Sequence, residues 1–156
     1  MSKNKGCLLT DARQQHTDTL FVSTTHSQTL VNKALATPRN GPKVQELLVQ
    51  MIEAEAGEHV LRQLVAGMAS NNGKQAVAAA QTARQALLVL GPVATHARLH
   101  LVPASIALFD SSSGAVRTEA LALTRQLILM LGPDIRPLFD SLRPIQVAPS
   151  AVMKAP

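Results

Sequence analysis

The sequence has neither tryptophan nor tyrosine, and only three of its 156 residues are phenylalanine. Its apolar residues still make up 46% of the chain, so they are mainly Leu, Ala, Val and Ile. Aliphatic and small side chains suit closely packed helices, whereas strands are enriched in aromatic and β-branched residues. The composition therefore predicts an all-α protein, and the length fits a single domain with a real core.

Cysteine is nearly absent, and Cys7 alone can form neither an internal disulfide framework nor a multi-cysteine zinc site. The chain also lacks an apolar run of about 18 residues, and its first 25 residues lack the apolar segment of a secretory signal. We therefore expect a cytoplasmic protein without a membrane partner. We expect a disordered leader over 1–25, a helical domain over 26–143, and an extended tail over 144–156, where prolines recur without apolar periodicity.

Acidic residues are fewer than basic ones, with ten Asp and Glu against fifteen Lys and Arg and a formal net charge of +5. This imbalance favours an acidic partner. The basic residues do not form the dense clusters of a dedicated nucleic-acid binder, so nucleic acid is disfavoured as the partner.

The sequence repeats itself with a spacing of 41 residues. GKQAVAAAQTARQALLVLGP at 73–92 aligns without a gap on GAVRTEALALTRQLILMLGP at 114–133. Each copy follows an apolar segment that runs into a short polar turn, at 64–72 and at 105–113. Two helices in a period near 40 residues are typical of HEAT and armadillo repeats, which must stack to bury their apolar faces. The sequence therefore predicts an α-solenoid of HEAT-type helical hairpins.

Helix ends are marked by Gly-Pro at 91–92 and at 132–133, where we expect a left-handed glycine cap followed by a residue that cannot continue the helix. Apolar periodicity and these end signals together define seven helices. They are expected at 27–36, 43–56, 58–69, 73–90, 94–109, 114–131 and 134–142.

No residue pattern in the chain supports catalysis, cofactor binding or metal binding. His96 and His100 have the spacing that faces two imidazoles together on a helix, but no carboxylate or cysteine lies nearby in sequence. The serines at 111–113 precede a helix and are expected to cap it, since no partner base accompanies them. Gly73 and Lys74 lack the rest of a phosphate-binding loop. We therefore predict a protein that is not an enzyme and has no small-molecule substrate.

Basic residues recur at the turns within the predicted hairpins. Arg39 and Lys43 flank the first turn, Lys74 follows the second, and Arg117 follows the third. Turns of stacked HEAT hairpins lie along one edge, so these four cations are expected to form a row. A cation in the first turn of a helix opposes the helix dipole by about 0.3–1 kcal/mol, which an acidic partner would offset. Taken singly, each of these residues is more simply explained as an ordinary solvated side chain.

The chain resembles the TOG domain of the microtubule polymerase family that includes the XMAP215 and Dis1 proteins. The resemblance runs from Thr29 to Val147 and includes a Val-Arg-x-Glu-Ala helix start at 116–120. It implies a partial domain, from the third HEAT unit to the start of the sixth. The corresponding segments are 30–55, 64–91, 108–132 and 134–147.

This resemblance implies tubulin or microtubules as the partner and a cytoskeletal location. The family grips tubulin with its intra-repeat turns, whose basic positions match Arg39, Lys74 and Arg117. Gly73, Gly114 and Thr118 depart from the usual residues, and the first two units are missing, with the tryptophan of the first turn. The alternative is a generic HEAT scaffold that binds another protein or a peptide on its helical face.

We also expect a tendency to self-associate at the N-terminal end. In the helix at 27–36, Leu30, Val31, Ala34 and Leu35 would lie against a preceding unit. A terminal HEAT unit needs a polar cap, and none is evident in the sequence before it.

Overall fold

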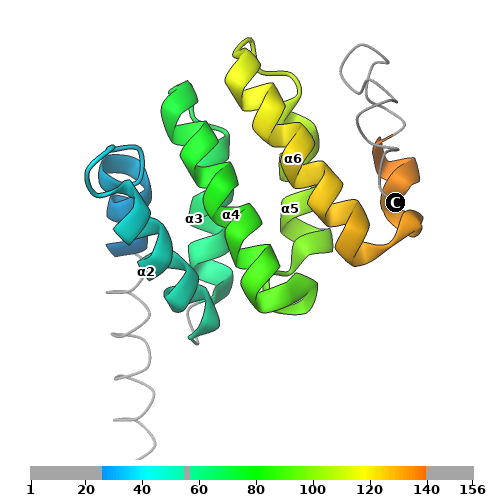
Figure 1. The fold of residues 1–156 in the computed structure, drawn as a ribbon, viewed down its shortest axis with the longest axis horizontal. Helices are drawn as coiled ribbons and strands as arrows, with labels where there is room; N and C mark the ends of the chain where they lie inside the picture. The colour runs from blue at the N-terminus through cyan, green and yellow to red at the C-terminus, as the bar shows by residue number, and fades with distance from the viewer. Residues whose placement is uncertain (1–25, 55–56, 140–156) are drawn as a thin grey trace, which may run out of the picture.

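A computed structural model describes residues 26–54 and 57–139, and these residues are helical without a strand (Figure 1). The prediction of an all-α protein is confirmed. A helical turn over 26–29 leads into the first element, and the expected leader and tail lie outside the described residues. The elements are η1 (Leu30–Ala34), α2 (Gly41–Glu53), α3 (Gly57–Met68), α4 (Gly73–Ala94), α5 (Ala97–Leu108), α6 (Gly114–Leu131) and η2 (Pro133–Phe139).

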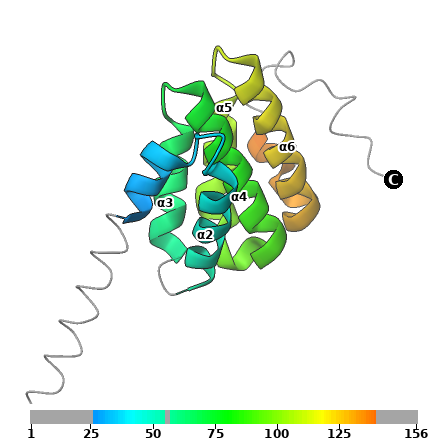
Figure 2. The ribbon, with the colours of Figure 1, turned by 60° about the vertical axis from the view of Figure 1, so that its left-hand side comes forward.

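The helices form three successive antiparallel hairpins, η1 with α2, α3 with α4, and α5 with α6. Helices α2, α4 and α6 make one layer, and η1, α3 and α5 make the other (Figures 1 and 2). Neighbours within each layer contact one another, and η2 packs on α6 at the C-terminal end. This is the two-layer α-solenoid that the 41-residue repeat predicts.

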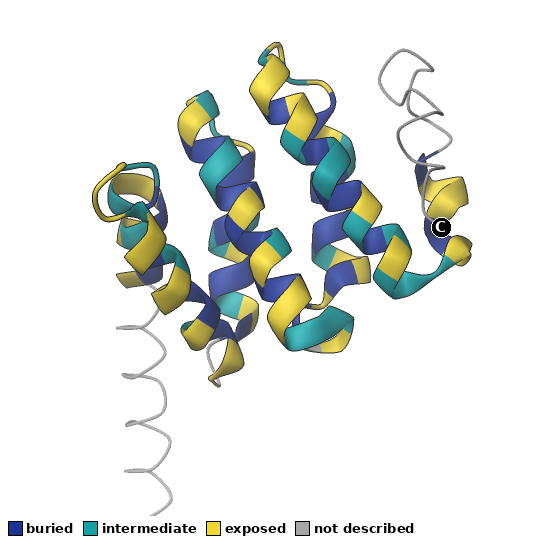
Figure 3. Cartoon of the chain, in the orientation of Figure 1, coloured by how far each residue is buried: buried dark blue, intermediate teal, exposed yellow. Residues whose placement is uncertain are grey.

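The core lies between the two layers, and the outer faces of α2, α4 and α6 are largely exposed (Figure 3). Small side chains allow the helices to approach closely, both within a layer and between the layers. A Cβ atom placed on Gly67 of α3 would lie 2.7 Å from Cγ1 of Val31 and 3.2 Å from the Cβ of Ala79. Five buried alanines of α4 extend the same close packing: Ala76, Ala79, Ala80, Ala83 and Ala86.

The first helix corrects one expectation. Val31 and Leu35 are only 1% and 4% exposed, because the described stack itself covers them, while Leu30 and Ala34 are half-buried. The burial of Val31 and Leu35 therefore does not require a preceding HEAT unit. The helix is also wider than a regular α-helix, with the N–H of Leu35 donating to the carbonyl of Leu30 at 2.9 Å.

The helix ends follow the Gly-Pro signals, with one correction to their geometry. Gly91 has φ 82° and ψ 175°, and Gly132 has φ 85° and ψ −177°. Positive φ was expected, but ψ near 180° places both residues in an extended region that is essentially restricted to glycine, not in the left-handed helical region. The regular part of α4 ends at this kink, and α6 has the predicted bounds 114–131.

The last predicted helix, at 134–142, is wrong in type. Residues 133–139 form the 3-10 helix η2. Pro133 and Pro137 have no backbone N–H to donate, and Pro137 lies inside the segment, so a regular α-helix is not maintained. Residues 140–142 lie outside the described part of the chain.

Polar side chains join neighbouring hairpins at two places. The Nε2 of Gln75 donates to Oδ1 of Asn32 at 2.9 Å, which links α4 to η1. The Nε of Arg84 donates to Oε1 of Glu119 at 2.9 Å, which links α4 to α6. These bonds add polar contacts to the apolar packing between the hairpins.

Candidate functional site

The three turns within the hairpins lie at the same edge of the stack, the upper edge in Figure 1. We call this surface the turn edge; it comprises residues 35–40, 69–72 and 109–113 and the first turns of α2, α4 and α6. The second and third turns lie close together, since a Cβ added to Gly73, just after the second turn, would lie 3.6 Å from Oγ of Ser113. The C-terminal ends of α2, α4 and α6 lie at the opposite edge (Figure 1).

The first turn carries Arg39, and the first turn of α2 carries Lys43; both side chains are exposed. Pro42 is the second residue of α2, where its missing N–H removes no hydrogen bond within the helix, because the first N–H groups of a helix have no intrahelical acceptor. Asn40 precedes the helix but makes no side-chain capping bond, and the first helical turn has no acidic residue. The N–H of Gly41 donates to the carbonyl of Thr37 at 2.7 Å and that of Val44 to the carbonyl of Asn40 at 3.0 Å, so this helix start presents mainly its two cations to solvent.

The second turn is held by side-chain bonds that the sequence analysis did not single out. Oδ1 of Asn72 accepts from the N–H of Lys74 at 3.1 Å, and Oγ of Ser70 accepts from the N–H of Asn72 at 3.2 Å. Lys74 is exposed at the start of α4. Asn is a favoured capping residue, so an Asn just before a helix start was the available signal.

The third turn corrects the expectation that the serines cap α6. Ser113 occupies the capping position but makes no side-chain capping bond, and Oγ of Ser111 instead accepts from the N–H of Ser113 at 3.2 Å. Nη1 of Arg117 donates to the carbonyl oxygen of Ser111 at 2.6 Å. The guanidinium of Arg117 is thus held against its own turn while remaining exposed.

All four predicted cations, Arg39, Lys43, Lys74 and Arg117, lie on the turn edge. Within residues 26–54 and 57–139, no carboxylate forms an ion pair with Arg39, Lys43 or Lys74. The first turns of α2, α4 and α6 contain no acidic residue. The edge therefore combines exposed positive side chains with the positive ends of three helix dipoles, and its third turn also carries the exposed carboxylate of Asp110.

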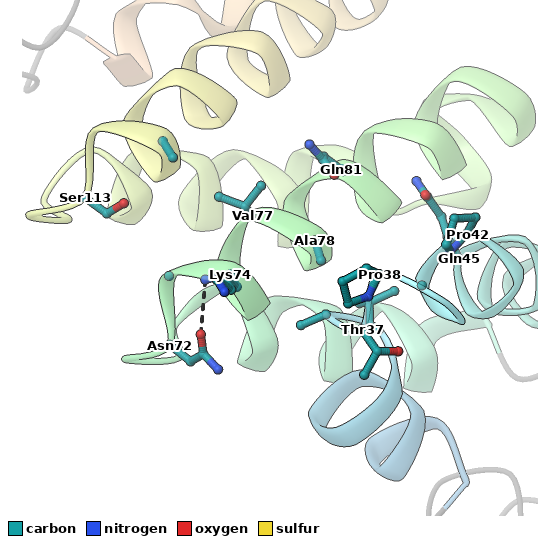
Figure 4. Close-up of a pocket in the computed structure, with 15 residues that line it drawn as sticks. Thr37, Pro38, Pro42, Gln45, Asn72, Lys74, Val77, Ala78, Gln81 and Ser113 are labelled. Atoms are coloured by element: carbon teal, nitrogen blue, oxygen red, sulfur yellow. Dashed lines mark hydrogen bonds between the residues drawn. The ribbon is translucent and has the colours of Figure 1, made fainter.

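A groove of about 1010 Å³ lies beside these turns, between α2 and α4, and the sequence analysis missed it (Figure 4). Its lining comes from all three hairpins, so no local pattern indicates it. Most of the lining is apolar, and Lys74 is its one charged residue. The residues that line it are 35–38, Gly41, Pro42, Gln45, 72–74, Val77, Ala78, Gln81, Ser113 and Ala115.

Of the two histidines near the start of α5, His100 lies close to a carboxylate from another helix. The rings of His96 and His100 are 6.1 Å apart between centroids, and Nε2 of His100 is 4.0 Å from Oε1 of Glu58 in α3. Glu58 also accepts from Arg62 at 2.6 Å. In the part of the chain that the structure describes, no three His, Cys, Asp or Glu residues are grouped to hold a metal ion. Cys7 lies outside that part.

The family described as "XMAP215/Dis1/CLASP, TOG domain" matches residues 7–149. This chain belongs to that family. Searches of curated proteins and of solved structures returned no match. The match begins at residue 7, well before the domain start expected at residue 26.

Membership confirms the resemblance to the TOG domain, whose family binds tubulin or microtubules, is associated with the cytoskeleton and is not catalytic. The assignment of this TOG domain to HEAT units three to six stays a prediction. No helix among the described residues has the length and apolar character needed to span a membrane.

Proposed function

We propose that this TOG domain binds tubulin through its turn edge, with Arg39, Lys43, Lys74 and Arg117 as the contacts. The observation that carries the proposal is the alignment of the three turns at one edge, each with an exposed cation and none followed by a first-turn carboxylate. Family membership supplies the kind of partner. We place the protein in the cytoplasm, on the cytoskeleton, with no enzymatic activity.

Electrostatics supports an acidic partner for this edge. A cation in the first turn of an exposed helix is unfavourable by about 0.3–1 kcal/mol, because the helix dipole is positive there. Lys43, Lys74 and Arg117 all occupy such positions. A negative surface brought against the edge attracts both the cations and the positive helix ends, and this attraction offsets the repulsion already present in the free domain.

Charge reversal tests the proposal. Lys74→Glu with Arg117→Glu should weaken binding of soluble tubulin at low salt by at least about tenfold, since close interfacial charge pairs couple by roughly 1.5–7 kcal/mol. Arg98→Glu with Arg136→Glu is the matched control, because both arginines are exposed, lie in α5 and η2, and change the net charge equally.

The difference between the two double variants should shrink at high salt, because salt screens exposed charges. Equal tubulin affinity of the turn-edge pair and the control pair at low salt would refute the proposal.

A further inference from the structure

The groove beside the turn edge presents apolar side chains to solvent. Pro38 of the first turn lies across from Ala78 of α4, with Pro42 towards one end and Lys74 towards the other (Figure 4). Val77 and Ala78 are half-buried and Pro38 and Pro42 are exposed, so a bound apolar group would remove further surface from water. The volume of about 1010 Å³ is at the upper end of ordinary ligand clefts.

Carboxamide groups accompany this apolar lining. Gln45 comes from α2, Gln81 from α4, and Asn72 from the second turn. A carboxamide both donates and accepts hydrogen bonds, as a peptide bond does. An apolar groove with carboxamides from two parallel helices suits an extended polypeptide, whose backbone needs such partners and whose side chains need apolar contact.

The charge of the groove selects against a basic occupant. No carboxylate lines it, and Lys74 does. The carboxylate of Glu119 accepts from the lining residue Gln81 at 3.5 Å, but it is paired with Arg84 at 2.9 Å and its side chain is only 12% exposed. The start of α2, near Pro42, and the start of α4, near Lys74, add positive potential at the two ends of the groove (Figure 4).

We propose that this groove docks an extended segment of a partner protein in which apolar residues are flanked by Asp or Glu. The groove shares Lys74 with the proposed tubulin contacts, whereas Arg39, Lys43 and Arg117 do not line it. A second copy of this chain fits less well, because its formal net charge is also +5. Two like-charged surfaces would meet at the groove in such a dimer.

Two labelled eight-residue peptides test the proposal with the full chain. Both contain the same Leu and Thr residues; one adds three Asp and the other adds three Lys at the same positions. Fluorescence anisotropy should show binding of the Asp peptide that weakens as salt rises, and at least about tenfold weaker binding of the Lys peptide. Absent binding of the Asp peptide, or equal binding of both peptides, would overturn the proposal.

Matched variants locate the site. Ala78→Glu places a carboxylate in the groove and should weaken the Asp peptide by about tenfold. Ala66→Glu makes the same change on an exposed position of α3 and should have no effect. Gln45→Glu and Gln63→Glu repeat the comparison with an isosteric exchange at two half-buried positions, in case Ala78→Glu disturbs folding. Equal effects within both pairs would show that the peptide binds elsewhere.

Two further measurements distinguish a peptide in the groove from tubulin binding at the turn edge and from a dimer of this chain. Arg117 does not line the groove, so Arg117→Glu should leave peptide affinity within about twofold while it lowers tubulin binding. The two proposals can therefore fail independently. A dimer in sedimentation velocity that Ala78→Glu dissociates would assign the groove to a second copy and overturn the proposal.

Discussion

Replacing Gly67 with alanine tests the close packing of the first two hairpins. The new Cβ would lie 2.7 Å from Cγ1 of Val31 and 3.2 Å from the Cβ of Ala79. The first of these distances is shorter than the contacts that Cβ atoms make in proteins, so a neighbouring group must shift. Overpacking a core typically costs about 1–3 kcal/mol. Alanine regains about 0.5–1 kcal/mol over glycine inside a helix. The net expectation is a loss of about 1–2 kcal/mol in the free energy of unfolding, or roughly 4–8 °C in Tm.

Thermal and urea denaturation followed by far-ultraviolet circular dichroism measure this loss. Gly114→Ala is the control, because a Cβ there meets only the guanidinium of Arg117, at 3.9 Å, and should leave stability unchanged or slightly raised. The double variant Gly67→Ala with Val31→Ala removes the clashing methyl group. Its loss in the free energy of unfolding should be about 1 kcal/mol smaller than the sum of the losses in the two single variants.

An increase in Tm for Gly67→Ala equal to that for Gly114→Ala would refute the reasoning. It would mean that α3 and η1 do not approach as closely as described. The position of the first turn beside the second would then lose its structural support.

Three further outcomes are expected. Gly91→Ala should lower the free energy of unfolding by about 1–3 kcal/mol, because φ 82° with ψ 175° is restricted to glycine; a change within error in urea denaturation would contradict this. Glu119→Gln should lower the free energy of unfolding by only about 1 kcal/mol, because its ion pair with Arg84 is partly exposed. A double-mutant cycle should show that this loss is absent in an Arg84→Gln background. Self-association at the N-terminal end should be weak, because Val31 and Leu35 are already covered and Leu47 is the exposed large apolar residue of α2. Sedimentation velocity should give a concentration-dependent fraction of dimer that Leu47→Ser reduces. A dimer fraction unchanged by Leu47→Ser would contradict the assignment.

The sequence predicted those parts of the fold that have a local cause. The bounds of α6 and the regular part of α4 follow from the repeat and from glycine with proline at each end. The ψ angles of Gly91 and Gly132 were not predictable, because a positive φ alone leaves two glycine regions open. The 3-10 form of η2 was signalled by Pro137 but overlooked.

The site was predicted less completely, because its geometry depends on contacts between distant residues. The turn positions of Lys74 and Arg117 followed from the repeat, but the bond from Arg117 to the carbonyl of Ser111 depends on the shape of the turn. The groove combines Pro38, Ala78 and Ser113 from three hairpins. Such a juxtaposition exists only once the hairpins have stacked.

The buried alanines of α4 influence any partner that binds the turn edge. Ala79, Ala83 and Ala86 are completely buried, and their short side chains set how closely α4 lies to its neighbours. The spacing of successive turns along the edge is therefore fixed in the interior. A rigid partner with acidic groups at fixed intervals would sense that spacing, so a single added methyl group deep in α4 could shift binding while every contact residue stays unchanged.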